Sequence, residues 1–188
     1  IGCFMIFLGL GGNLNCETYG SPRRTCGAAL ELLARKNIKI VANSRWYESA
    51  PVPISDQPWF VNGVVGVETT LSPKDLVASV LEVEADLGRR RSVPNASRTI
   101  DIDVLAYDDQ IISEHDQSDA SNVVIPHPRM HLRAFVLLPL ADIAPDWGHP
   151  ISGAHIRDLI NGLPKDQVCK PMPDGEGLSG TEWQPEAA

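Results

Sequence analysis

The order of segments along the chain predicts an α+β fold: a ferredoxin-like antiparallel sheet with helices packed on it, in a single domain. Strand-like apolar patterns occupy residues 3–10, 38–49, 59–71 and 99–105. Helical patterns occupy residues 22–37 and 73–87, and each follows a Ser-Pro pair. The order is therefore strand, helix, two strands, helix, strand. We expect the helices to lie on one face of the sheet.

The first strand and the first helix carry clear signals. Residues 3–10 form a continuous apolar run, which is typical of a central strand buried on both faces. Ser21 then supplies an N-cap and Pro22 the first helical position, and the helical pattern continues to about Asn37. The opening "IGCFMIFLGLGG" has no basic segment and soon breaks into glycines. We therefore interpret it as a buried strand and not as a signal peptide.

Two strands and a second helix follow. Residues 38–49 and 59–71 are separated by a loop that contains three prolines. Ser72 and Pro73 repeat the capping signal, and Gly88 follows the last apolar residue of the helical pattern. These features predict a strand pair and then a helix that ends at the glycine.

The last part of the chain gives weaker signals. The sequence "YDDQ" after the fourth strand predicts a turn into a short return strand. Helices are expected within residues 132–143, despite Pro139, and at residues 154–161. The C-terminal end is rich in Pro, Gly and Glu, which is typical of disorder. We therefore expect one domain, residues 1–170, and a disordered tail, residues 171–188.

The composition is that of an acidic globular protein with one basic cluster. Hydrophobic residues make up 43% of the 188 residues, enough to build a core. The formal net charge of -8 argues against nucleic acid as a partner, because duplex binding needs a broad basic surface. Four of the 16 basic residues nevertheless lie in one short run without an acid: Arg89, Arg90, Arg91 and Arg98. This cluster predicts a discrete anion site.

The cysteines and the hydropathy bear on the compartment. The four cysteines show neither CxxC spacing nor a paired pattern, which favours reduced thiols in a cytoplasmic protein. No apolar run is long enough to cross a bilayer, so a membrane partner is not expected. We expect a monomer that acts on small molecules.

Two aspartates occupy one face of an otherwise apolar strand. Asp101 and Asp103 are two residues apart, so both carboxylates leave the same face, with Cα atoms roughly 6.6 Å apart. Carboxylates at this spacing can converge on one or two hard cations such as Mg2+, which also takes phosphate oxygens. The alternative is an exposed strand face with two solvated acids. The apolar flanks and the arginine loop that precedes the strand favour the metal site.

The loop "GRRRSVPNASR" supplies positive charge beside the predicted metal site. Arginine forks match phosphate oxygens and keep their charge, as stabilisation of a transferring phosphoryl group requires. The alternative is a solvated basic loop. Neither common nucleotide motif is present: "GLGGNL" has Leu14 where a dinucleotide fingerprint needs glycine, and no P-loop sequence occurs.

Further candidate residues lie on the third strand and in a proline-rich turn. Phe60 and Asn62 share one strand face, where an amide beside an aromatic ring could bind a flat polar heterocycle. The alternative for Asn62 is a satisfied core amide. His127 lies between two prolines, a setting that is usual for a structural turn residue.

Taken together, these motifs resemble the 6-hydroxymethyl-7,8-dihydropterin pyrophosphokinase family. The resemblance rests on "LGLGGNL", "SRWYESAPV", "SDQPWFVNGVVGVETTLSP", "LGRRR", "SRTIDIDVLAY" and "IPHPRMHLRAFVLLPLADIAP". It runs in order from about Phe7 to about Leu163. The combination of D-Q-P-x-F-x-N, R-T-x-D-x-D and P-H-P is specific to this family.

The resemblance implies an enzyme of folate synthesis with a ferredoxin-like fold. It would transfer the β,γ-diphosphate of ATP to the hydroxymethyl group of the dihydropterin and release AMP. Two Mg2+ ions would be held by Asp101 and Asp103, and Arg89, Arg91 and Asp103 would serve catalysis. The residues implied for ATP are Glu84, Arg91, Arg98, Val104, His127 and Arg133. The residues implied for the pterin are Ser49, Ala50, Val52, Phe60, Asn62 and Phe135.

The sequence departs from the family pattern at several points. Many members have R-W-G-P-R before the aspartate motif, whereas "PNASR" stands here, so the tryptophan is missing and the loop is shorter. Pro128 replaces a frequent tyrosine after P-H, and "GGN" replaces a frequent G-S-N. The segment before Pro126 is longer and acidic.

Two other functions fit parts of the sequence. A D-x-D glycosyltransferase would use the same aspartate pair, but it normally needs a longer nucleotide-sugar domain. A non-catalytic ferredoxin-like nucleotide-binding module is the stronger alternative. An RNA-binding module would carry basic and aromatic residues across the sheet, whereas this chain places acids there.

Overall fold

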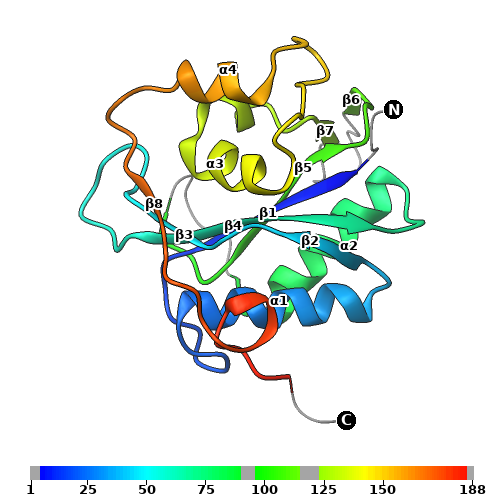
Figure 1. Cartoon of the computed structure of the whole chain (residues 1–188). Coiled ribbons are helices and arrows are strands. Elements are labelled where there is room, and N and C mark those ends of the chain that lie inside the picture. Colours follow the sequence, from blue (N-terminus) through cyan, green and yellow to red (C-terminus); the bar gives the residue numbers. More distant parts are fainter. Residues whose placement is uncertain (1–4, 90–95, 115–122, 186–188) are drawn as a thin grey trace.

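The computed structural model describes residues 5–89, 96–114 and 123–185. Its centre is a six-stranded antiparallel sheet in the order β5-β1-β4-β3-β8, with β2 also paired to β4 (Figure 1). The strands are β1 (Ile6–Gly12), β2 (Lys39–Asn43), β3 (Tyr47–Ser49), β4 (Phe60–Glu68), β5 (Asp101–Tyr107) and β8 (Cys169–Pro171). The predicted α+β class with an antiparallel sheet is confirmed.

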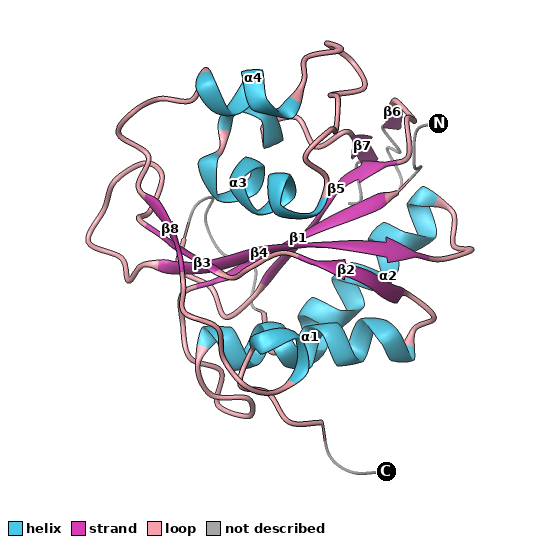
Figure 2. Ribbon diagram, viewed as in Figure 1, coloured by secondary structure: helices cyan, strands magenta, loops and turns pink. Residues whose placement is uncertain are grey.

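Helices cover both faces of the sheet, not one face as expected (Figure 2). The helices α1 (Pro22–Arg35) and α2 (Pro73–Asp86) lie on one face, and α3 (Ala134–Ile143) and α4 (Ile156–Asn161) on the other. The reason lies in the apolar residues of the central strands. Leu8 packs into the α1/α2 core, whereas its neighbour Phe7 packs with Val64 into a second core under α3. A strand that is apolar on both faces requires a helical layer on each side.

The capping signals of the first two helices are confirmed. The Ser21 hydroxyl accepts from the backbone N–H of Arg24, and the Ser72 hydroxyl accepts from that of Asp75. Gly88 follows α2 with a φ of +77°, a left-handed conformation that glycine adopts without strain. The expected helix with an internal proline is present as α3, which contains Pro139.

Two strand predictions need correction. Residues 38–49 form two strands instead of one. The ladder to β4 changes at Ser44, whose N–H donates to Val64 O at 3.0 Å while its hydroxyl accepts from Val64 N at 2.9 Å. The short strand after the predicted turn, β6 (Ile112–Glu114), pairs with β7 (Val123–Ile125) and not with β5. The two strands form a separate small sheet.

The C-terminal segment, for which the composition predicts disorder, packs against α1 over its described part, up to residue 185. The chain runs from α4 past β8 to the short 3-10 helix η2 (Leu178–Gly180) beside α1 (Figure 1). Arg23 on α1 donates to Pro173 O at 2.8 Å, and Trp183 Nε1 donates to Glu31 at 2.7 Å. Thr181 is fully buried against Gly27. Composition alone did not reveal these partners, which lie far away in sequence.

The segment should therefore contribute to stability. We expect Trp183→Ala to lower the free energy of unfolding by about 1–2 kcal/mol, because it removes a half-buried ring and its hydrogen bond to α1. Urea unfolding of this variant, compared with Gln184→Ala at the exposed neighbouring position, measures the effect. Equal unfolding midpoints for the two variants would show that the packed segment adds nothing.

Candidate active site

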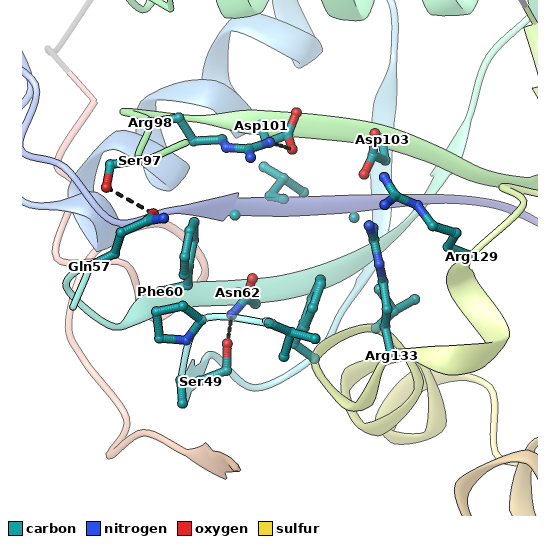
Figure 3. A pocket seen from close by; sticks show the side chains of 18 of the residues that line it. Ser49, Gln57, Phe60, Asn62, Ser97, Arg98, Asp101, Asp103, Arg129 and Arg133 are labelled. Atoms are coloured by element: carbon teal, nitrogen blue, oxygen red, sulfur yellow. Dashed lines mark hydrogen bonds and ion pairs between the residues drawn. The ribbon is translucent and has the colours of Figure 1, made fainter. Parts of the chain in front are cut away.

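A cavity of about 650 Å3 opens between the sheet, the loop that follows β3 and the start of α3 (Figure 3). Its volume lies in the range of small-molecule sites. Aspartates and arginines line one end, whereas aromatic and amide side chains line the other. The cavity therefore combines an ionic end with a flat, partly apolar slot.

The two aspartates face this cavity from β5, as their spacing predicts (Figure 3). In the sheet register, Asp101 lies opposite Gly11 of β1 and Asp103 lies opposite Gly9. Cross-strand partners point to the same face, so β1 contributes no side chain beside the aspartates, and the Leu105 and Asn62 side chains pack against these glycines instead. A Cβ at Gly11 would lie 2.8 Å from Asn62 Oδ1, so β1 and β4 are closely packed at this side of the cavity.

Asp101 is held by two arginines. Arg89 Nη1 lies 2.6 Å from Asp101 Oδ1, and Arg98 forms an ion pair with the other carboxylate oxygen. Arg89 also pairs with Glu84, which is 2% exposed and accepts from Ile102 N at 2.6 Å. Burial raises the pKa of Glu84 to about 7, although the charge of Arg89 opposes the rise. Glu84 therefore anchors both Arg89 and the backbone of β5.

Asp103 is less completely paired than Asp101. Its side chain faces His127, whose Nε2 lies 3.9 Å from Asp103 Oδ2. Burial in the cavity, with the neighbouring charge of Asp101, raises the pKa of Asp103 to about 6. A bound cation would offset both effects and favour the ionised form.

His127 combines a turn role with a position in the site. Its Nδ1 accepts from Arg129 N at 3.1 Å, so the neutral ring carries its proton on Nε2, on the side of Asp103. Burial, followed by the charges of Arg133 and Arg129, lowers the pKa of His127 to about 4. The ring is therefore neutral at pH 7 and can donate one hydrogen bond into the site.

The residues predicted for the heterocycle meet at the other end of the cavity. Asn62 Nδ2 donates to Ser49 Oγ at 2.8 Å, which turns Asn62 Oδ1 toward the cavity (Figure 3). Phe60 on β4 and Phe135 on α3 both line the cavity, as do Ala50 and Val52 from the loop after β3. An acceptor oxygen and two aromatic rings in one slot suit a flat heterocycle with N–H donors.

The remaining predicted residues are placed in different ways. Arg98 and Arg133 line the large cavity, and the Arg133 guanidinium lies 5.3 Å from the centre of the Phe135 ring. Val104 and Glu84 instead line an adjacent cleft of about 210 Å3, which shares Asp101 and Asp103 with the large cavity. Arg91 lies outside the described residues.

Sequence reasoning missed a polar network that joins three parts of the site. Asn13 Oδ1 accepts from Arg98 N at 2.9 Å, and Asn13 Nδ2 donates to Pro58 O at 2.9 Å. Ser97 Oγ donates to Gln57 Oε1 at 2.9 Å. This network ties the end of β1 to the arginine loop and to the loop after β3. The asparagine of "GGN", 4% exposed here, was its one visible signal. Arg129, a further lining residue, was also missed.

The donor set at the ionic end fits Mg2+. No cluster of three or more His, Cys, Asp or Glu side chains suited to a metal occurs among residues 5–89, 96–114 and 123–185. Mg2+ keeps several waters and takes phosphate oxygens, so one or two carboxylates suffice when a nucleotide supplies further ligands. Asp101 and Asp103 meet this requirement, with arginines nearby for the phosphates.

The comparison with protein families agrees with this geometry. The model of 7,8-dihydro-6-hydroxymethylpterin-pyrophosphokinase (HPPK) matches residues 7–145. The chain belongs to the HPPK family. The match includes both aspartates, the arginine run and the aromatic slot.

Curated relatives cover most of the chain. The 2-amino-4-hydroxy-6-hydroxymethyldihydropteridine pyrophosphokinase of Pseudomonas aeruginosa is 38% identical over 164 residues, which are 87% of this chain and 94% of the relative. The enzyme of the same name from Methylorubrum extorquens is 39% identical over 157 residues, 84% of this chain and 92% of the relative. The folic acid synthesis protein fol1 of Pneumocystis carinii is 36% identical over 89% of this chain, but this match covers 21% of that longer protein.

Solved structures support the fold of the HPPK family. A crystal structure of a Plasmodium falciparum HPPK-DHPS triple mutant matches with a TM-score of 0.65 and 18% identity. The match covers 84% of this chain and 43% of that chain, so the present chain spans less than half of that polypeptide. Among the helices of the described ranges, none is long and apolar enough to cross a membrane.

The raised pKa of Asp103 makes a prediction about stability. The folded state binds a proton between about pH 4 and pH 6 that the unfolded state has released, so the free energy of unfolding falls as the pH rises through this window. Asp103→Asn removes the titrating carboxyl and therefore this loss of stability at higher pH. We expect the variant to gain roughly 2–4 °C in Tm relative to wild type at pH 8, and less at pH 5.

Thermal unfolding of both proteins without nucleotide or Mg2+ provides the measurement. Asp109→Asn, on the exposed turn after the same strand, is the matched control and should show the same Tm difference at both pH values. A gain for Asp103→Asn that does not change with pH would contradict the electrostatic cause.

Proposed function

We propose that this chain transfers the β,γ-diphosphate of ATP to the hydroxymethyl group of 6-hydroxymethyl-7,8-dihydropterin and releases AMP, as a step of folate synthesis. One observation carries the proposal: a single cavity joins a carboxylate pair with arginines to an aromatic slot with one amide. Membership of the HPPK family and the names of its close relatives agree with it. A non-catalytic module would have no need for the ionic end to open into the heterocycle slot.

Asp101 and Asp103 would hold the metal, and we propose two Mg2+ ions. Bound Mg2+ would neutralise charge on the phosphates and orient them for displacement. The protein's own step is an exchange of partners at Asp101. Arg89 and Arg98 form ion pairs with this carboxylate. Both would turn toward phosphate oxygens once the carboxylate coordinates the metal. Together with Arg91 they would stabilise the transferring group.

The nucleotide would span the large cavity and the adjacent cleft. The triphosphate would lie at the ionic end, where Arg133 and His127 line the large cavity. The adenosine would enter the adjacent cleft. This cleft is lined by Glu84 and by valine and isoleucine side chains, Val104 among them. Asp101 and Asp103 line both the large cavity and the adjacent cleft, so the phosphates would lie between the two.

The pterin would lie flat in the slot. Asn62 Oδ1 would accept from the N–H groups of the pterin edge, and Ser49 holds the amide in this orientation. Phe60 and Phe135 would pack against the two ring faces, and Ala50 and Val52 would form the wall. This placement points the hydroxymethyl group toward the aspartates, where its oxygen would attack the β-phosphorus of ATP in line.

We further propose that the protein works in the cytoplasm as a monomer. Cys16, Cys26 and Cys169 are free in the described part of the chain, which agrees with a reducing compartment.

Product analysis tests the function directly. With ATP, Mg2+ and 6-hydroxymethyl-7,8-dihydropterin, we expect AMP and diphosphorylated pterin in equal amounts, and a loss of at least about 10²-fold in kcat for Asp103→Ala. Release of ADP would indicate an ordinary kinase. The proposal would fail if folded protein that binds Mg-ATP formed no AMP, or if Asp103→Ala kept the wild-type rate.

A further inference from the structure

Gln167 holds the backbone on both sides of Arg133. It lies in the connection between α4 and β8, more than 30 residues beyond that arginine. Its Oε1 accepts from Ala134 N at 2.8 Å, and its Nε2 donates to Leu132 O at 2.8 Å. One planar amide thus fixes the two peptide groups that flank Arg133.

This contact replaces a cap that α3 lacks. Arg133 is the N-cap residue of α3 in an extended conformation, with φ of -122° and ψ of 116°, and its side chain makes no capping hydrogen bond. The first N–H groups of a helix need outside acceptors, and Gln167 supplies one of them to Ala134 N. The side chain of Arg133 is thereby left to extend into the cavity (Figure 3).

The neighbouring residue reaches the opposite wall of the site. Val168 O accepts from Ala50 N at 3.1 Å, and β8 then pairs with β3, which ends at Ser49. One short segment therefore contacts both the start of α3 and the loop that closes the heterocycle slot.

We propose that Gln167 is a positioning residue that sets the direction of Arg133 and Phe135 in the active site. It acts through the backbone of residues 132–134 and touches neither substrate. The Arg133 guanidinium lies over the Phe135 ring at 5.3 Å, so a change in the peptide planes beside Arg133 moves the phosphate end and the aromatic slot together. The inference rests on the proposed roles of Arg133 and Phe135 in substrate binding.

A helix cap that serves only stability would behave differently from a positioning residue. Loss of such a cap lowers Tm but leaves kcat/KM unchanged at temperatures where the variant is fully folded. Loss of a positioning contact changes kcat/KM in the folded enzyme. The two roles are therefore separated by kinetics measured well below the Tm of each variant.

The test compares Gln167→Ala with Gln167→Glu and with Asp166→Ala, an exposed neighbour. We expect Gln167→Ala to lower kcat/KM for both ATP and the pterin roughly 10- to 100-fold, since small misplacements of substrate-positioning groups have effects of this size. Gln167→Glu keeps the oxygen that accepts from Ala134 N but cannot donate to Leu132 O, so its kcat/KM should fall between those of wild type and Gln167→Ala. Asp166→Ala should match wild type. A Gln167→Ala enzyme with wild-type kcat/KM overturns the inference.

A double-mutant cycle shows whether Gln167 acts through Arg133. We expect Gln167→Ala to have a much smaller effect on kcat/KM for ATP in the Arg133→Ala background than in wild type. Independent, additive effects overturn the inference. If Arg133→Ala and Phe135→Ala alone leave kcat/KM unchanged, the proposed binding roles fail and the inference fails with them. If these two variants are impaired but Gln167→Ala is not, the inference alone fails.

Discussion

The ion pairs of Asp101 are the interaction on which the site depends. Two carboxylates leave one strand face into a cavity, where burial and the charge of Asp101 oppose the ionisation of Asp103. Arg89 and Arg98 compensate Asp101, and Glu84 in turn holds Arg89. This arrangement gives the Asp101 carboxylate two ion-pair partners. It also holds Arg89 and Arg98 beside the proposed phosphate site.

The sheet and its two helical layers make this arrangement possible. Glycines at positions 9 and 11 of β1 let Leu105 and Asn62 pack closely against the strand, and the second core under α3 brings Phe135 over the same face. The aromatic slot therefore forms between a strand and a helix that are distant in sequence. The C-terminal segment joins these walls, because Gln167 contacts the start of α3 and Val168 contacts Ala50.

Much of this fold could be predicted from local patterns. The Ser-Pro caps, the apolar central strand and the common face of Asp101 and Asp103 each depend on residues close in sequence, and the structure agrees with all three. The second helical layer followed from the two-sided burial of β1 but was overlooked. The partners of Asp101 could not be foreseen, because a run of arginines does not reveal which of them turns inward. The packed C-terminal segment was hidden for a related reason: its order depends on Arg23 and Glu31, which lie far away in the sequence.

The claim that the aspartate pair holds the metal and the triphosphate of ATP can be tested most directly by calorimetric titration with a non-hydrolysable ATP analogue. The titration would use wild type, Asp101→Asn and Asp103→Asn, each with Mg2+ and with a chelator. We expect Mg2+ to strengthen binding to wild type, and the affinity of each variant in Mg2+ to fall to the chelator level. Wild-type affinity that is independent of Mg2+, or variants that bind the Mg2+ complex as tightly as wild type, would contradict the assignment.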